Sequence, residues 1–166
     1  PVRGLYLEAI DRAEHHVYIT QAYFIPDREI LAALIAAAKR GVDVRVLVPK
    51  VSNHVLADWA ARSYYAQLLE AGVTLWLFHG AMVHAKTMTV DGRWSTIGTA
   101  NIDRMSMTGN FEVNLEFYDD GLAEHMERVF ATDLTNCTEL TLEQWNRRGR
   151  LTRVLEYLIK PLGPLM

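Results

Sequence analysis

The sequence predicts an α/β fold in which a mixed β-sheet is flanked by helices on both faces. In the first half of the chain, segments with the apolar spacing of helices alternate with short β-branched segments, which is typical of strands joined by crossover helices. The second half adds three strand-like segments, two of them joined at Asp91-Gly92, a pair that favours a tight hairpin turn. Half of the 166 residues are hydrophobic, which suits one packed domain and excludes a disordered chain.

Helices and strands alternate through the first half of the chain. Spacing and composition predict helices at 5–14, 28–40 and 55–70, and strands at 16–21, 42–48 and 73–78. Asp27 is a suitable N-cap for the second helix, and Gly41 stands where a helix end favours a left-handed residue. Because each helix can carry the chain back to the start of the next strand, we expect a largely parallel arrangement in this half.

The second half of the chain has a different pattern. Strands are expected at 85–90, 94–97 and 113–118, followed by a helix at 122–135 and a polar linker. The hairpin at Asp91-Gly92 reverses the chain, so antiparallel strands join the parallel ones and the sheet becomes mixed.

Charge and cysteine content exclude several classes of protein. The chain has 17 Lys and Arg residues against 20 Asp and Glu, a net charge of −3, so strong attraction of the whole chain to nucleic acid is not expected. Its one cysteine, Cys137, cannot form an internal disulfide or a cysteine-rich zinc site, which favours a reducing compartment. The apolar run at 31–38 is too short to cross a bilayer, which takes about 20 residues.

The last part of the chain, 141–166, differs in charge from the rest. It carries five basic and two acidic side chains, although the whole chain is acidic. We therefore divide the chain into a folded domain, 1–140, and a basic amphipathic C-terminal tail, 141–166. The apolar residues of the tail recur with helical spacing: Leu151, Val154, Leu155, Leu158 and Ile159. Such a helix either lies at a membrane interface, with its arginines toward anionic head groups, or docks on the core of the domain.

A group of polar residues suited to catalysis lies between 83 and 103. His84 and Lys86 are two residues apart, so on a strand their side chains point to the same face. An ammonium beside an imidazole suits the binding of a phosphate oxygen. After the next strand, Thr99 and Asn101 supply a hydroxyl and a carboxamide, which are neutral donors for the same kind of anion. Taken alone, His84 and Lys86 also fit a core histidine beside a lysine that extends to solvent.

Residues elsewhere in the chain complete this candidate site. Glu112 opens a later strand, where a carboxylate could fix the tautomer of a histidine. Asn53 and His54 lie in the loop after the second strand, where loops gather around a site, and Tyr23 either lines the entrance or packs. For Asp103 and Arg104 we expect a loop ion pair rather than catalysis. Metal-ligand spacing is absent among the other histidines considered: His15, His16, His79 and His125.

The motif His84-x-Lys86-x4-Asp91, followed by Gly98-Thr99-x-Asn101, resembles the HKD signature of the phospholipase D superfamily. The resemblance extends over nearly the whole chain, and within the superfamily it is to the C-terminal half-domain of bacterial cardiolipin synthases. Thr99 stands where the family more often has Ser, which keeps a hydroxyl but adds a methyl group. The resemblance implies a phospholipase D-like half-domain fold for 1–140.

The resemblance also implies a role for each residue of the motif. His84 would attack the phosphodiester phosphorus and form a phosphohistidine intermediate. Lys86 and Asn101 would hold the non-bridging oxygens, and Glu112 would hold the imidazole. Asp91 belongs to the signature, but its place at a strand end favours a structural role. The predicted substrate contacts are Thr99, Asn53 and Tyr23. Neither a metal nor another cofactor is implied.

The family's active unit contains two such motifs, and this chain has one. Either two copies pair, as in the single-motif nucleases of the family, or a second half lies in a portion preceding Pro1. The start at Pro1 rather than at Met, together with the synthase-like sequence, favours the second arrangement. The histidine of the other half would then act as general acid for the leaving alcohol. We expect the isolated chain to be inactive, or weakly active if it dimerises.

The implied reaction is phosphatidyl transfer, in which two phosphatidylglycerol molecules yield cardiolipin and glycerol at the cytoplasmic face of the bacterial inner membrane. The alternatives are phosphodiester hydrolysis, by a lipid phospholipase D or a homodimeric nuclease, and a binding module that has lost activity. The acidic character of the folded domain, 1–140, argues against the nuclease, because a nucleic acid substrate favours a basic cleft. The intact His84, Lys86 and Asn101 argue against the binding module. The expected partners are a phospholipid, a second HKD half-domain and, through the tail, a membrane surface, with no nucleic acid favoured.

Overall fold

The structure, a computed structural model, describes residues 2–149. Its first half comprises α1 (Val2–Arg12), β1 (His16–Gln21), α2 (Arg28–Lys39), β2 (Asp43–Pro49), α3 (Val55–Glu70) and β3 (Thr74–Phe78). Its second half comprises β4 (Lys86–Val90), β5 (Trp94–Gly98), the π-helical turn η1 (Met105–Gly109), β6 (Asn114–Tyr118), α4 (Asp120–Leu134), β7 (Cys137–Leu140) and α5 (Leu142–Asn146). Each helix and strand predicted between 5 and 135 is present, with ends that differ by only a few residues.

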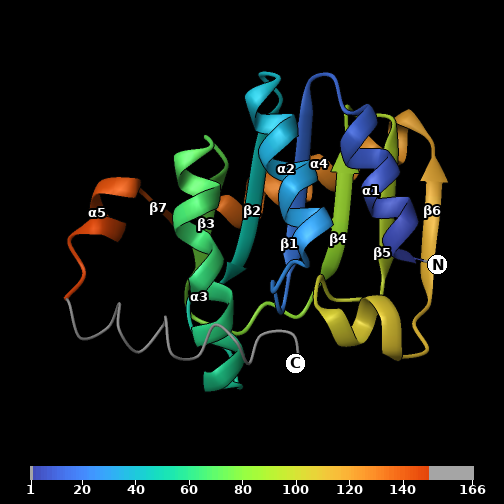
Figure 1. Cartoon of the computed structure of the whole chain (residues 1–166). Coiled ribbons are helices and arrows are strands. Elements are labelled where there is room, and N and C mark those ends of the chain that lie inside the picture. Colours follow the sequence, from blue (N-terminus) through green and yellow to red (C-terminus); the bar gives the residue numbers. More distant parts are fainter. Residues whose placement is uncertain (1, 150–166) are drawn as a thin grey trace.

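The strands form one mixed sheet in the order β6-β5-β4-β1-β2-β3-β7. β1, β2 and β3 are parallel, whereas β4, β5, β6 and β7 each pair with a neighbour in the antiparallel direction. Figure 1 shows α1, α2 and α3 on one face of the sheet and α4 on the other. The predicted mixed sheet with helices on both faces is therefore confirmed.

Local signals in the sequence account for the helix ends and the hairpin. Asp27 caps α2, since its carboxylate accepts from the backbone N–H groups of Glu29 and Ile30 at 2.9 Å each. The hairpin between β4 and β5 turns at Asp91 and Gly92, whose φ angles are 54° and 65°. Positive φ at both central residues is the geometry of a tight hairpin turn, which Asp-Gly adopts readily.

Apolar side chains on the inner faces of the helices and both faces of the sheet form the core. The residues that are fully buried there include Ile10, Ile19, Leu34, Leu68 and Met88. They come from α1, β1, α2, α3 and β4, so both halves of the sequence contribute side chains to the core. In residues 2–149, none of the helices combines the length and the hydropathy needed to cross a bilayer.

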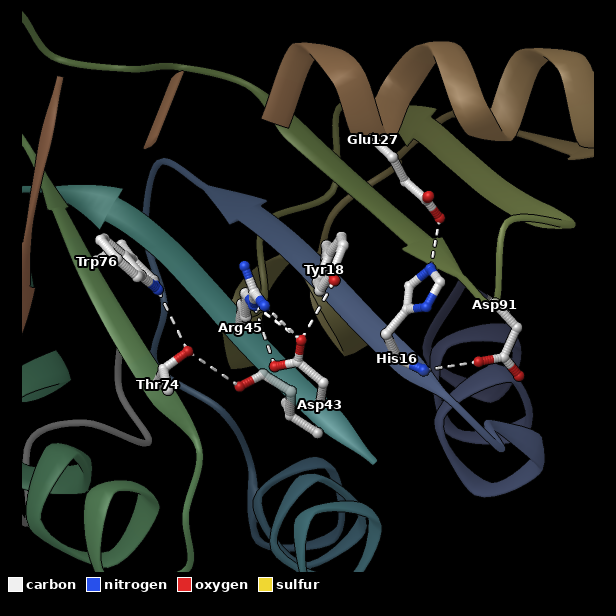
Figure 2. A network of polar contacts seen from close by, with 9 residues as sticks. His16, Tyr18, Asp43, Arg45, Thr74, Trp76, Asp91 and Glu127 are labelled. Atoms are coloured by element: carbon white, nitrogen blue, oxygen red, sulfur yellow. Dashed lines mark hydrogen bonds and ion pairs between the residues drawn. The ribbon is translucent and has the colours of Figure 1, made fainter. Parts of the chain in front are cut away.

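Polar contacts join the amino ends of β1 and β2 to α4 and to the hairpin turn (Figure 2). His16 Nε2 lies 2.5 Å from Glu127 Oε1 of α4, and the backbone N–H of His16 donates to Asp91 Oδ1 at 2.8 Å. Asp43 of β2 accepts from the Tyr18 hydroxyl of β1 at 3.2 Å, and Arg45 Nη2 pairs with the same Asp43 at 2.6 Å. This network fixes the end of the sheet at which β1 begins.

The polar linker predicted after α4 is wrong, because the chain there forms β7 and α5. β7 pairs with β3 and so satisfies backbone groups that an edge strand would leave open. Thr141 and Gln144 form a capping box that starts α5. Trp145 is buried, with its ring centroid 5.3 Å from that of Tyr65 on α3. The packed part of the chain thus reaches Trp145, and the apolar stripe predicted from Leu151 lies outside the described residues.

Candidate active site

Three segments that carry the predicted site residues meet at one end of the strands, where β4 begins and β5 ends. β4 runs antiparallel to both β1 and β5, and β5 runs antiparallel to β6. The start of β4, the end of β5 and the start of β6 therefore lie side by side, next to the carboxyl end of β1. Gln21 stands opposite Lys86 in this register, and Gly98 stands opposite Asn114. The fold brings His84, Lys86, Thr99, Asn101 and Glu112 to the same region.

His84 and Lys86 form the centre of this region. The Lys86 ammonium donates to the backbone oxygen of His84 at 2.8 Å and lies 3.1 Å from His84 Nδ1 and 3.3 Å from Nε2. An ammonium has donors only, so the imidazole nitrogen that it contacts is the acceptor. His84 is exposed, whereas Lys86 is only 7% exposed. The pair therefore presents an imidazole to solvent with a buried cation directly behind it.

The electrostatic surroundings of Lys86 favour the binding of an anion. Burial lowers the pKa of Lys86 below its ordinary value, while the carboxylates of Glu112 and Asp103 oppose this shift. A partly desolvated ammonium gains more from a nearby anion than one in water does, because the local dielectric constant is lower. A phosphate oxygen beside His84 would lie next to this cation.

Thr99 and Glu112 bind one another across the β5–β6 connection. The Thr99 hydroxyl donates to Glu112 Oε2 at 2.5 Å and accepts from the backbone N–H of Val113 at 3.0 Å. Both ring nitrogens of His84 face Lys86 in this structure. The role implied for Glu112 in holding the imidazole therefore stays a prediction, as does the contact of Thr99 with substrate.

Asn101 has hydrogen-bonding capacity that the described residues leave unused. Its Oδ1 atom is buried and has no hydrogen-bond partner among residues 2–149. The same is true of Nε2 of Gln21, a fully buried side chain whose Oε1 accepts from the backbone N–H of Ile102 at 3.2 Å. Buried amide groups without partners are costly.

Tyr23 connects the histidine to the predicted substrate contact on the β2–α3 loop. Its ring meets that of His84 edge-on, with centroids 6.3 Å apart, and its hydroxyl donates to Asn53 Oδ1 at 2.5 Å. Backbone hydrogen bonds hold this segment, since Ala22 N donates to Ala85 O at 3.1 Å and Ile25 N to Ile102 O at 2.7 Å. Tyr23 and Asn53 are thus brought to the site together.

A hollow of about 420 Å³ opens beside this group. It is lined by Tyr23, Ile25, Asn53, His54, Val55, Leu56, Ala57 and Asp103. Half of these residues are polar and half are apolar, which suits a ligand with a polar and an apolar part.

Asp103 and His54 also line the hollow. The sequence favoured a loop ion pair over catalysis for Asp103, and it placed His54 beside Asn53 in a loop expected near the site. Asp103 is 8% exposed and lines the hollow, and its Oδ1 accepts from the backbone N–H of Ser106 at 2.7 Å. Burial raises the pKa of Asp103, and the hydrogen bonds from Ser106 only partly oppose this effect. His54 lies with its ring centroid 5.6 Å from that of Tyr23. In the sequence, Asp103 is distinguished only by its position two residues after Asn101, and an aspartate of an exposed loop can have the same spacing.

Asp91 lies apart from the other predicted site residues. It follows the last residue of β4, whereas Lys86 is the first, a separation of roughly 15 Å along the strand. Its carboxylate accepts from the backbone N–H groups of Glu14, His15 and His16 at 2.8 Å each. These contacts agree with the structural role that its strand-end position favoured.

No group of three or more His, Cys, Asp or Glu side chains suited to a metal ion occurs within the described range 2–149. The positive charge that lies beside His84 is that of Lys86.

Comparison with known proteins identifies the family. A family model described as the phospholipase D-like (PLD-like) domain of cardiolipin synthase matches residues 6–134. The chain belongs to this family. The match includes the HKD motif and the segments that carry Tyr23 and Asn53, so the resemblance seen in the sequence is confirmed.

Two curated relatives and one solved structure show how far the similarity of this PLD-like domain extends. It is 38% identical over 165 residues to a cardiolipin synthase of Clostridium perfringens (strain SM101 / Type A), which covers 99% of this chain and 35% of that protein. It is 36% identical over 160 residues to cardiolipin synthase A of Yersinia pseudotuberculosis serotype O:1b (strain IP 31758), which covers 96% of this chain and 33% of that one.

The solved structure is that of Nuc from Salmonella typhimurium, a phospholipase D family member. It superposes with a TM-score of 0.72 at 27% sequence identity, over 84% of this chain and 90% of that one. The PLD-like domain therefore spans about a third of the length of the curated relatives but nearly the whole of Nuc.

Proposed function

We propose that this PLD-like domain is one half of a phosphatidyltransferase that converts two phosphatidylglycerol molecules into cardiolipin and glycerol. The observation that carries the proposal is an exposed imidazole backed by a buried ammonium 3.1 Å away, in a chain 38% identical to a cardiolipin synthase. The rest of the active unit is a second HKD half-domain, located elsewhere in the same full-length protein.

The reaction proceeds in two displacements at phosphorus. A ring nitrogen of His84 attacks the phosphorus of the first phosphatidylglycerol, a P–N bond forms, and the P–O bond to the glycerol head group breaks. The histidine of the second half donates a proton to the departing glycerol oxygen. A hydroxyl of the second phosphatidylglycerol then attacks the same phosphorus, the P–N bond breaks, and the second histidine takes the hydroxyl proton.

Lys86, Asn101 and Thr99 stabilise the charge that builds on the non-bridging oxygens during both displacements. Removing one preorganised donor of this kind from an enzyme site typically lowers kcat by about 10²- to 10³-fold. Lys86 makes the largest contribution to this charge stabilisation, because it is the buried cation next to His84. Tyr23 and Asn53 would then contact the head group from the adjoining hollow.

The substrate sets where the full-length protein acts. Phosphatidylglycerol is confined to a bilayer, so the proposal includes association with a membrane, at the cytoplasmic face of the bacterial inner membrane. A basic tail at 141–166 would add attraction to anionic lipid.

A second candidate is phosphodiester hydrolysis by a pair of identical chains. The specific support is that this domain covers 90% of Nuc, so a phospholipase D family member of about this size exists as a complete solved chain. Water would then replace the second alcohol as the acceptor. The net charge of −3 argues against a nucleic acid as the substrate of such a pair.

Product analysis with head-group-labelled and acyl-labelled phosphatidylglycerol tests the proposal. The full-length protein should yield cardiolipin and free glycerol, whereas hydrolysis would yield phosphatidate and glycerol. His84→Ala should abolish both products, and His125→Ala, on the exposed face of α4, should retain wild-type turnover. Turnover by His84→Ala at the wild-type rate would remove His84 from the mechanism.

A further inference from the structure

Three aliphatic side chains project into solvent at the start of α3. Val51 is 66% exposed, Val55 is 65% exposed and Leu56 is 58% exposed. Val51 lies in the loop after β2, and Val55 and Leu56 belong to the first turn of α3. We call these three residues the apolar lip. Single exposed aliphatic residues are ordinary on a protein surface, but a cluster of them marks an interaction site more often.

The loop that carries the apolar lip is held in place by its own polar groups. Ser52 N donates to Asp58 Oδ2 at 3.0 Å, and His54 N donates to the Ser52 hydroxyl at 3.0 Å. Lys50 N donates to Phe78 O at 3.0 Å, which ties the loop to the end of β3. The side chains of Ser52 and Asp58 therefore fix the backbone of the loop, while Val51, Val55 and Leu56 remain exposed.

The apolar lip borders the candidate active site. Val55 and Leu56 line the hollow of about 420 Å³ together with Tyr23, Asn53 and Asp103. Tyr23 in turn contacts the ring of His84. Whatever covers the lip therefore lies next to a hollow whose lining includes Tyr23, the neighbour of His84.

Basic side chains flank the lip on its other side. Val51 and Lys50 share a second hollow with Arg62 of α3 and with Asp58, whose carboxylate accepts from Ser52 N. Lys50 is exposed and Arg62 is half-buried. Aliphatic side chains next to an ammonium and a guanidinium match the layering of an anionic lipid surface, where charged head groups lie above the acyl chains.

We propose that the apolar lip of Val51, Val55 and Leu56 inserts into the head-group region of an anionic phospholipid bilayer and so places the hollow beside His84 over the lipid phosphate. This inference rests on the proposed function, because it assigns a lipid phosphodiester to the site. Lys50 and Arg62 bind the head groups of neighbouring lipids, and a lipid then enters the hollow without leaving the bilayer completely.

The experiment compares surface variants of the full-length protein that contains this chain. The test variant changes Val51, Val55 and Leu56 to Ser, and Leu56→Trp enlarges the lip with a side chain that prefers the membrane interface. The matched control is Val129→Ser, an aliphatic side chain 44% exposed on α4, across the sheet from α3. Thermal unfolding verifies that all variants fold.

Two quantities are measured for each variant. One is the fraction of protein that co-sediments with vesicles of phosphatidylglycerol and phosphatidylcholine. The other is the ratio of turnover on these vesicles to turnover on short-chain phosphatidylglycerol below its micelle concentration. The triple Ser variant should lower both quantities about tenfold, since each buried aliphatic group contributes to the partition. Leu56→Trp should keep or raise both, and Val129→Ser should match the wild type.

The outcomes separate this inference from the proposed function. Unchanged vesicle binding by the triple variant would overturn the inference, and so would an equal loss of turnover on vesicles and on monomers. The second result would assign the lip to contact with the bound substrate in the hollow or with the other half-domain. A wild-type protein that turns over neither form of the lipid, yet binds vesicles through the lip, would count against the proposed function while supporting the membrane contact.

Discussion

Asp91 and Asp103 show how two aspartates of one domain acquire opposite properties from their surroundings. Burial tends to raise the pKa of Asp91, but backbone N–H donors from Glu14, His16 and His15 outweigh it and lower the pKa overall. Burial also raises the pKa of Asp103, and there the donors from Ser106 do not compensate. Folding therefore favours the anionic form of Asp91 and disfavours the anionic form of Asp103, each relative to the unfolded chain.

Replacing each of these aspartates by Asn should change the pH dependence of stability in opposite directions. The pKa of Asp91 is lowered on folding, so its contribution is present above the unfolded value of about 3.9 and is lost as pH falls below it. Asp91→Asn should therefore destabilise the protein at pH 7 by about 1 to 3 kcal/mol, because an amide oxygen accepts the backbone hydrogen bonds more weakly than a carboxylate does. Near pH 3 the loss should be much smaller.

The contribution of Asp103 has the other sign. Its pKa is raised on folding, so its stabilisation is complete below about pH 3.9 and is lost as pH rises through the folded value. Asp103→Asn should gain stability relative to the wild type between pH 3 and pH 7. Urea unfolding of both variants at several pH values measures the two effects, and parallel curves for the two would contradict them.

The motif residues could be predicted from the sequence because their spacing alone carries the information. His84 and Lys86 share a strand face, and Asn101 follows at a fixed distance. Asp103 and Gln21 could not be assigned in the same way. Gln21 ends an apolar strand and is fully buried only because β1 lies between β2 and β4, an arrangement that depends on the whole sheet. Contacts between distant segments decided their environment.

At the scale of elements, the end of β5 lies unusually close to the start of β6. A Cβ atom on Gly98 would lie 2.5 Å from the backbone oxygen of Val113 and closer still to the side chain of Asn114. Glycine is therefore required here for close approach of two strands, and φ is not the reason. This contact fixes the start of the segment that carries Thr99 and Asn101.

Gly98→Ala should displace that segment. The backbone of β6 cannot move without breaking its pairing with β5, so we expect a loss of about 1 to 3 kcal/mol in the free energy of unfolding. Turnover by the folded variant should also fall, because Thr99 and Asn101 shift relative to Lys86. Chemical denaturation and steady-state kinetics on the full-length protein measure the two. Wild-type turnover with reduced stability would show that the segment keeps its position by other contacts.

The C-terminal elements β7 and α5 were missed because their signals are short. Four residues of β7 alternate weakly, and α5 is a single capped turn and a half. Each is fixed by a partner that precedes it by many residues, β3 for the strand and α3 for Trp145. The long alternating segments of the first half carry their own periodicity and were predicted with nearly correct ends.

Trp145→Ala should show that α5 is part of the folded domain. The side chain is 5% exposed and packs on Tyr65, so its removal should cost about 3 to 5 kcal/mol in the free energy of unfolding. Trp59→Ala, in a half-buried position on the same helix as Tyr65, gives the comparison. An effect of Trp145→Ala smaller than about 1 kcal/mol would place the domain boundary before α5, as the division at 140 predicts.

At the scale of the whole molecule, residues 2–149 supply the proposed nucleophile, His84, and a buried cation, Lys86, whereas the proposed pair of displacements would also need a proton donor on the far side of the phosphorus. The relatives are about three times as long as this chain, and Nuc is about as long. These lengths fit the two ways of completing the active unit, with a different half in the same protein or with an identical chain. The oligomeric state and the activity of the isolated chain distinguish them.

The isolated chain of 166 residues should turn over phosphatidylglycerol at least about 10³-fold more slowly than the full-length protein, because it lacks both the proton donor and half of the oxygen-binding groups. Mixing it with the separately produced remainder of the full-length protein should restore turnover, and His84→Ala in the isolated chain should prevent the restoration. Light scattering reports the mass of each species.

An isolated chain that is a dimer and fully active would instead support the symmetric unit, with hydrolysis as its reaction. Both copies of His84 act in such a dimer, one as nucleophile and one as general acid, so a dimer with one His84→Ala chain is inactive. Mixing wild-type and His84→Ala chains should then lower activity as the square of the wild-type fraction, whereas the two-half protein would lose activity in direct proportion to that fraction.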